Sequence, residues 1–223
     1  MMGNLVKQNF LILSPHTYLG VILAMLVAFI MALPASFIFV VSFFALIFSL
    51  YTYDNKNHVQ RFIVSLPVSK KNIIRGRYIY SVCTVIFLLL ILWVWMGLLS
   101  LSPLLTDNHY VYNWRDMVVM FAIGGLIISF SSPILYRLPF YFSSLIILIS
   151  LGVGSFFYIS AMMDILGREN ADVIIFNDMD AGLSLLAEKY IPFLPYFILI
   201  LGTFTLLYIS MLICTRLVEN KDM

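Results

Sequence analysis

A long uncharged stretch near the start of the chain limits what it can fold into. No Asp, Glu, Lys or Arg occurs from Gln8 to Tyr53. A single helix over this stretch would be about twice as long as the roughly 30 Å hydrocarbon layer of a membrane, because each helical residue adds about 1.5 Å. Pro34, in the sequence MALPAS, interrupts the stretch, since proline lacks the backbone N–H that a helix interior requires. We therefore predict two short membrane spans, at about 16–33 and 35–52, joined by a tight turn.

The rest of the chain has the same apolar character. Hydrophobic residues make up 62% of the 223 residues and charged residues 11%, against about 45–50% and about 25% in ordinary globular domains. Further apolar runs predict spans at about 78–101, 117–132, 140–160 and 193–214, with a short turn at SSPILYRLP (131–139). The predicted fold is an all-α polytopic membrane protein with six transmembrane helices in one domain, residues 1–223. Residues 1–15 are expected to form a helix on the inner membrane surface.

The charged residues are divided unequally between the two sides of the predicted bundle. If both termini lie inside, the outer segments hold only Arg115, Arg168 and Lys189 of the thirteen Lys and Arg residues. Eight of the eleven acids lie in the outer segments. Because an excess of Lys and Arg marks cytoplasmic loops, we predict that both termini are cytoplasmic. The inner cations are Lys7, Lys56, Arg61, Lys70, Lys71, Arg75, Arg77, Arg137, Arg216 and Lys221.

The longest polar stretch, residues 161–192, falls on the outer side. Asp180 is a candidate N-cap for a short helix whose apolar face would contain Leu183, Leu186, Ala187 and Tyr190. Such a helix would lie on the outer leaflet, or it would act as a gate or lid over a transport path. The six acids of the segment fit no metal-binding spacing and are interpreted as a solvated face: Asp164, Glu169, Asp172, Asp178, Asp180 and Glu188.

A dense basic segment, residues 57–72, interrupts the apolar sequence. Its first part predicts a short amphipathic helix that ends at Pro67, and Ser69 predicts the N-cap of a second helix that continues into the third span. Lys70 and Lys71 then fall in the first turn, where the helix dipole is already positive. We expect a compensating negative partner, either anionic lipid headgroups or an acidic groove on another protein.

The sequence RFIVSLPVSKKNIIRGRYIY resembles the segment that follows the second span in ABC-2 type membrane permeases. The shared pattern comprises Ser65, Leu66, Pro67, Val68, Ser69, Lys70, Ile73, Ile74, Arg77 and Tyr78. The resemblance implies a half-transporter fold of the type V exporter kind, which pairs with a second copy or a paralogue. It also implies that segment 57–72 is a coupling helix that contacts a separate ATPase subunit. The implied coupling residues are His58, Gln60, Arg61, Ser65, Leu66, Pro67, Val68, Ser69, Lys70 and Lys71.

Within the family, the chain is most similar to compact bacterial permeases of toxin-peptide and antimicrobial-peptide export and immunity. That similarity implies a bacterial plasma-membrane location and an amphipathic peptide as substrate, with membrane lipids and ATPase subunits as partners and no nucleic acid. ATP and magnesium would be bound by the ATPase, because the chain has no G-x-x-x-x-G-K-[ST] sequence. No cofactor or metal is expected in the chain itself, since its three histidines lie apart.

Two pairs of small residues stand four apart inside predicted spans, Ser150 with Gly154 and Gly125 with Ser129. Such pairs let helices approach closely, either within one chain or across a dimer. The resemblance favours the fifth span together with the first span for a dimer contact, so Ser150 and Gly154 are the candidates.

Charges are nearly absent from the predicted spans, which argues against ion channels and proton-coupled carriers. The chain is therefore not expected to be an enzyme, since no polar catalytic cluster lies at depth. A non-transporting scaffold or immunity subunit that recruits an ATPase is the alternative function.

Overall fold

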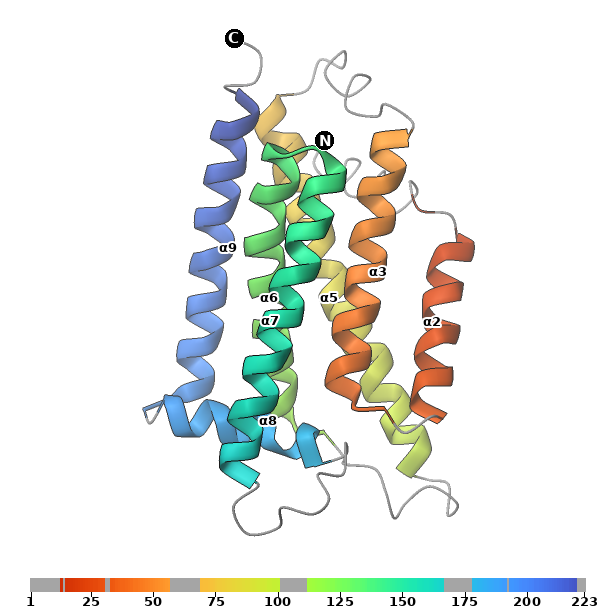
Figure 1. Ribbon diagram of the computed structural model, residues 1–223, viewed down its shortest axis with the longest axis vertical. Coiled ribbons are helices and arrows are strands. Elements are labelled where there is room, and N and C mark those ends of the chain that lie inside the picture. The colour runs from red at the N-terminus through yellow and green to blue at the C-terminus, as the bar shows by residue number, and fades with distance from the viewer. Residues whose placement is uncertain are drawn as a thin grey trace.

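The structure, a computed structural model, describes residues 13, 15–30, 33–56, 69–100, 112–166, 178–191 and 193–219. These residues form helices and their connections (Figure 1). The helices are α2 (Pro15–Ile30), α3 (Ala35–Lys56), α5 (Lys70–Ser100), α6 (Trp114–Arg137), α7 (Phe140–Leu166), α8 (Asp178–Tyr190) and α9 (Pro195–Glu219). The predicted all-α class is confirmed for this part of the chain. The predicted surface helix at residues 1–15 lies almost entirely outside it.

Five of the described helices are long and apolar enough to cross a membrane: α3, α5, α6, α7 and α9. Helix α2 is also apolar but has 16 residues, a length of about 24 Å. It is shorter than the roughly 30 Å hydrocarbon layer. The structure therefore supports five candidate spans where the sequence predicted six. The predicted break at Pro34 is confirmed, because α3 begins directly after it and the Ile38 N–H donates to the Pro34 carbonyl at 3.0 Å.

One predicted boundary is wrong. The sequence SSPILYRLP is not a turn, because α6 continues through Pro133 to Arg137 and only Leu138 and Pro139 separate it from α7. The amide of Leu138 closes the helix by donating to the Ile134 carbonyl at 3.0 Å. A proline inside a membrane helix is tolerated where a neighbouring helix satisfies the freed carbonyl, and α9 does so here, as described below.

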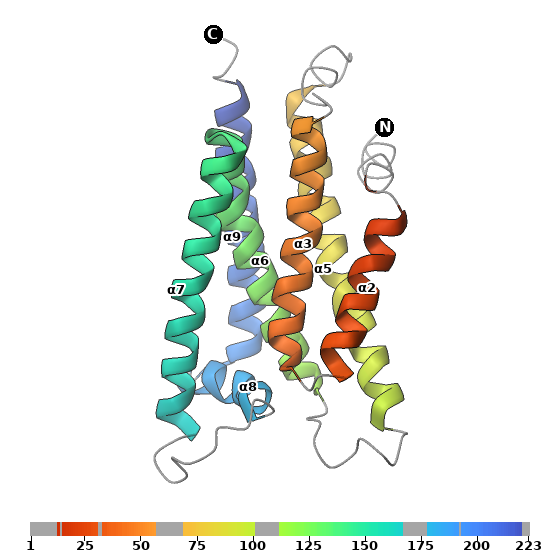
Figure 2. The ribbon, with the colours of Figure 1, turned by 45° about the vertical axis from the view of Figure 1, so that its right-hand side comes forward.

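The long helices alternate in direction and lie side by side in both views (Figures 1 and 2). The start of α5 therefore lies at the same end of the bundle as the ends of α3, α6 and α9, and we call this end the elbow end. Helix α8 lies across the opposite end, against α6, α7 and α9, and we call this the α8 end.

Helices α6 and α9 form the tightest pair in the bundle. Gly125 of α6 faces Thr203 of α9 so closely that no side chain would fit there, and neighbouring Gly124 faces Val85 of α5. Apolar side chains from several helices fill the interior, including Met25, Phe39, Phe43, Leu46, Ile74, Tyr80, Leu88, Leu92, Met120, Ile128 and Ile147. Helix α7 is different, since most of its described side chains face outward.

Candidate functional site

The predicted coupling segment meets the described structure where α5 begins. Ser69 comes directly before the helix, and its carbonyl accepts the amides of Asn72 at 2.9 Å and Ile73 at 3.3 Å. The predicted helix start at this position is confirmed. Lys70 and Lys71 form the first turn, with Lys70 half-buried and Lys71 exposed. The other predicted coupling residues lie outside the described part of the chain: His58, Gln60, Arg61, Ser65, Leu66, Pro67 and Val68.

Helix α5 runs without interruption for 31 residues from Lys70 to Ser100. The prediction that the helix after Ser69 continues into the third span is confirmed, and the membrane boundaries of that span at 78–101 stay a prediction. The start of α5 at Lys70 and its membrane-crossing part are therefore one continuous helix.

Arg77 lies two turns into α5 and is buried, with 4% of its surface exposed. Its guanidinium lies 5.6 Å from the ring centre of Tyr51 in α3 and 5.8 Å from that of Tyr136 in α6. The two rings meet edge to face, with centres 6.2 Å apart. A desolvated cation between two aromatic rings is attracted to both. Arg77 therefore joins α5 to α3 and α6.

The next residue, Tyr78, joins α5 to α9. Its hydroxyl lies 2.7 Å from Ser210 Oγ and 3.2 Å from Cys214 Sγ. Ser210 in turn donates to the backbone carbonyl of Ser129 in α6 at 2.7 Å. Because a serine hydroxyl has only one hydrogen, Tyr78 is the donor to Ser210. We call Arg77, Tyr78 and these partners the Arg77–Tyr78 cluster.

The Arg77–Tyr78 cluster places one short stretch of α5 in contact with α3, α6 and α9, close to the start of the helix where the predicted coupling segment ends. Sequence reasoning missed it, because Arg77 was counted among the inner-loop cations and Tyr78 as the first residue of a span. The sequence did contain one indication: Arg77 and Tyr78 are the last two residues of the pattern shared with ABC-2 permeases. Nothing in the sequence indicated Ser210 or Cys214 as their partners. The structure also shows that Arg77, directly before the predicted third span, is buried between helices.

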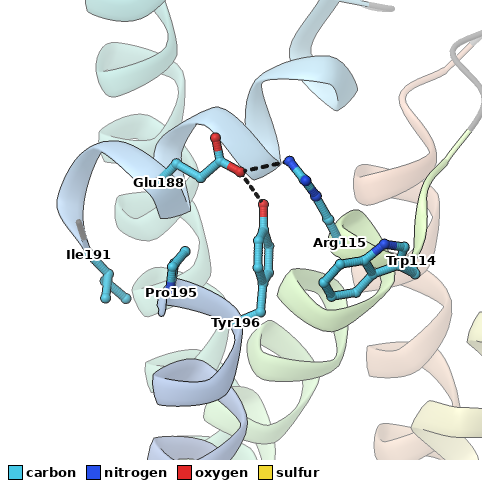
Figure 3. A pocket seen from close by; sticks show the side chains of 6 residues that line it. All are labelled: Trp114, Arg115, Glu188, Ile191, Pro195 and Tyr196. Atoms are coloured by element: carbon cyan, nitrogen blue, oxygen red, sulfur yellow. Dashed lines mark hydrogen bonds and ion pairs between the residues drawn. The ribbon is translucent and has the colours of Figure 1, made fainter. Parts of the chain in front are cut away.

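The α8 end contains a second polar group. The Oε1 atom of Glu188 in α8 accepts a bond from Arg115 Nη1 of α6 at 3.1 Å and one from the Tyr196 hydroxyl of α9 at 2.7 Å. Figure 3 shows both bonds converging on this one oxygen. Arg115 also lies 5.8 Å from the ring centres of Trp114 and Tyr196, which are themselves 5.1 Å apart. We call Glu188, Arg115 and Tyr196 the Glu188 cluster.

The Glu188 cluster borders an open pocket of about 370 Å³ (Figure 3). Its lining residues are Trp114, Arg115, Glu188, Ile191, Pro195 and Tyr196. The solvated-face interpretation is incomplete for Glu188, which is 41% exposed but paired with Arg115. The side chains of the other five acids of segment 161–192 lie outside the described residues.

The predicted helix in segment 161–192 is present as α8, but its start differs. The helix begins at Asp178, so Asp180 lies within it and is not its N-cap. Leu183 is buried as predicted, whereas Tyr190 is 67% exposed. The predicted apolar face thus extends only part of the way along α8.

The two small-residue pairs have different surroundings. Gly125 packs against α9, and the Ser129 hydroxyl donates to the Gly125 carbonyl within α6 at 2.8 Å. This pair serves packing within the chain. In α7, by contrast, Gly154 is exposed with no atom near the position of an added Cβ, and Ser150 donates to its own helix at the Ile147 carbonyl. A dimer role for Ser150 and Gly154 stays a prediction.

In the part of the chain that the structure describes, no group of three His, Cys, Asp or Glu side chains could hold a metal ion. Cys83 and Cys214 form no disulfide.

Comparison with known proteins places the chain in one family. A family model described as "ABC-2 family transporter protein" matches residues 4–219, nearly the whole chain. No curated protein and no solved structure matches the chain.

Proposed function

Since the chain belongs to the ABC-2 family of transporter membrane proteins, we propose that it is the permease subunit of an ATP-driven exporter. The family assignment makes it a multi-pass membrane component of an ABC transporter, a kind of subunit that generally lacks an ATPase domain and works with an ATPase partner. The proposal adds that residues 57–72 are the coupling segment, and that the exporter moves hydrophobic or amphipathic peptides out of the cell.

The observation that carries this proposal is the Arg77–Tyr78 cluster beside the start of α5. Residues 57–72 end inside the first turn of α5, and Arg77 and Tyr78 follow within two turns. Arg77 contacts α3 and α6, and Tyr78 contacts α9. A push on the coupling segment would therefore displace four helices together. Such a rigid link is what a separate motor subunit needs in order to change access through a bundle.

The proposed orientation puts the elbow end in the cytosol. Helix α5 begins there with Lys70 and Lys71, α6 ends there at Arg137, and Arg216 lies in the last turn of α9. The α8 end carries Arg115 and Lys189 among its described cations. The excess of cations at the elbow end supports a cytoplasmic side for that end, in a bacterial plasma membrane, with both termini cytoplasmic.

Helix α2 is proposed as a sixth, short span. Its 16 residues have no charged side chain, and it packs beside α3 and α5, with Tyr18 and Tyr80 hydroxyls 2.9 Å apart. A short apolar helix is accommodated by local thinning of the bilayer at modest cost. With α2 as a sixth span, residue 15 and the last turn of α9 lie on the same side of the membrane.

A dimer through α7 completes the proposed transporter, with a second copy or a paralogue as partner. Along one side of α7, Ser150 is half-buried and Gly154 exposed, and Val153 and Phe157 nearby are also exposed. Small residues on an outward face permit close approach of a second membrane helix.

The proposed substrate class follows from the composition of the bundle and from the sequence resemblance. Apolar side chains dominate the described helices, which suits an amphipathic peptide better than a small ion. Within the compact permeases, the resemblance points to the staphylococcal exporter of phenol-soluble modulins. A peptide of that class is therefore the substrate for the test.

The test is reconstitution of the chain with its ATPase in proteoliposomes. Leu66→Asp and Val68→Asp should abolish substrate-stimulated ATP hydrolysis and peptide transport while the protein still inserts in the membrane. Ile79→Ala, at an exposed position of α5 outside the coupling segment, serves as the control and should lower activity much less. A Leu66→Asp variant that binds the ATPase and transports normally would contradict the coupling role. If the wild-type complex shows no substrate-stimulated turnover, the scaffold or immunity function is the better one.

A further inference from the structure

Helix α8 packs against α6, α7 and α9, and its side chains differ in how deeply they are buried. Leu183 is buried, with 2% of its surface exposed, and is the apolar anchor of the helix. Toward its C-terminal end the side chains turn outward, with Leu185 46% and Tyr190 67% exposed. The polar Glu188 cluster lies at this loosely packed end (Figure 3). Its bonds therefore add to the apolar contacts that hold this end of α8.

The Glu188 cluster joins three helices through one carboxylate. Arg115 is the second residue of α6 and Tyr196 the second residue of α9. Glu188 therefore fixes the last turn of α8 to the first turns of two long helices. An exposed ion pair alone contributes little, but a hydroxyl bond to a charged carboxylate is stronger.

The backbone next to α8 is strained. Leu194, in the connection to α9, has a φ of 44°, in the left-handed region that residues with a side chain rarely adopt. Regular hydrogen bonding exists on both sides, since the Ile191 amide donates to Ala187 and the Ile198 amide to Leu194. Strain confined to such a short connection persists only where surrounding contacts maintain it.

We propose that α8 is a lid over the outer end of the bundle, and that Glu188 is the positioning residue that holds it closed through Arg115 and Tyr196. Opening of this contact accompanies release of the substrate on that side. The pocket beside the cluster has walls from α6, α8 and α9, so its shape changes when the lid moves. This inference rests on the proposed export function for its role in release, but not for the contact itself.

The contact is tested without transport. Hydrogen exchange is measured by mass spectrometry on the full chain in lipid nanodiscs, for peptides that cover 182–191. Glu188→Ala should raise their exchange rate about fivefold or more, because the end of α8 loses its bonds to two helices. Lys189→Ala is the matched control on the adjacent exposed position and should leave the rate unchanged. Peptides from α3 and α5 should exchange equally in all variants, which excludes general unfolding. An unchanged rate at 182–191 in Glu188→Ala would overturn the inference.

The role in release is tested by fixing the contact. In a Cys83→Ala, Cys214→Ser background, Arg115→Cys and Glu188→Cys are joined by a short thiol linker that dithiothreitol cleaves. Joined protein, with its ATPase in proteoliposomes, should lose most peptide transport and recover it after cleavage, while each single cysteine variant is unaffected by the linker. Transport that continues in the joined protein would overturn the lid.

A second measurement separates positioning from mere folding. Glu188→Gln keeps an acceptor for Tyr196 but loses the charge that attracts Arg115. It should give exchange intermediate between wild type and Glu188→Ala, and it should lower the number of peptides moved per ATP hydrolysed without lowering ATP hydrolysis. Equal peptide yield per ATP in wild type and Glu188→Ala would count against the lid. Absence of transport in the wild type would overturn the export function and the role in release, and the exchange result would then decide the contact alone.

Discussion

The hydroxyl of Ser210 in α9 donates a hydrogen bond to the backbone carbonyl of Ser129 in α6 at 2.7 Å. In a regular helix that carbonyl would accept the amide of the residue four positions later, which is Pro133 and has no N–H. A side chain from another helix thus replaces the bond that the proline removes. This replacement explains how α6 continues through Pro133 to Arg137, where the sequence alone predicted a turn.

The Ser210–Ser129 bond predicts a specific coupling between two substitutions. Ser210→Ala should lower stability by about 1 kcal/mol, since interhelical side-chain bonds in membranes average about 0.6 and reach about 1.7 kcal/mol. In a Pro133→Ala background the cost should be smaller, because the substitution restores a backbone N–H that can donate to the Ser129 carbonyl. The Tyr78 bond to Ser210 is lost in both backgrounds and cancels in the comparison. Unfolding in mixed micelles measures both costs, and equal costs in the two backgrounds would contradict this explanation of α6.

Close contact of α6 and α9 at Gly125 predicts a large effect of one methyl group. Gly125→Ala should lower stability by about 1–3 kcal/mol, because its Cβ meets the Thr203 methyl group. Thr203→Ser removes that methyl group, keeps the hydroxyl bonded to the Leu199 carbonyl, and should restore most of the loss. Gly152→Ala, where nothing lies near the added Cβ, is the control and should be neutral. Thermal unfolding in detergent distinguishes these variants; no rescue by Thr203→Ser would mean that another contact sets the α6–α9 distance.

Arg77 is predicted to affect coupling as well as stability. Arg77→Ala should lower stability by about 2 kcal/mol, because it removes the desolvated guanidinium and with it the attraction to both aromatic rings. It should also lower transport per ATP hydrolysed, since α5 loses the contacts that Arg77 makes with Tyr51 of α3 and Tyr136 of α6. Arg77→Lys keeps the charge and should retain part of both. Arg75→Ala, two positions earlier and only half-buried, should change neither much. If Arg77→Ala loses stability but transports normally per ATP, the residue serves folding only.

The proposed orientation predicts which end of the bundle is reached from outside. In a Cys83→Ala, Cys214→Ser background, a membrane-impermeant maleimide should label Lys189→Cys in intact cells, because that side chain is exposed at the α8 end. Ser69→Cys, exposed at the elbow end, should be labelled only after the membrane is permeabilised. Labelling of Ser69→Cys in intact cells would reverse the orientation and remove the basis for an ATPase contact at residues 57–72.

The features that the sequence predicted correctly depend on short-range chemistry. The break at Pro34 and the helix start after Ser69 follow from groups within one turn of those residues, so neighbouring positions are enough to recognise them. The membrane class likewise follows from how each uncharged segment partitions between water and hydrocarbon. Helix length was less predictable for α6, because its continuation through Pro133 depends on the Ser210 hydroxyl of another helix.

Only the tertiary structure decided how the polar groups are satisfied. Ser210 lies 81 positions from Ser129, Glu188 lies 73 from Arg115, and Tyr78 lies 132 from Ser210. In an apolar environment each buried polar group requires a partner, but the requirement does not say which distant residue supplies it. The sequence by itself therefore determined a membrane protein with a basic elbow and the places where several helices begin. The packing of α5, α6, α8 and α9 decided which side chains bond to one another, because residues this far apart in the chain meet only when the helices have assembled.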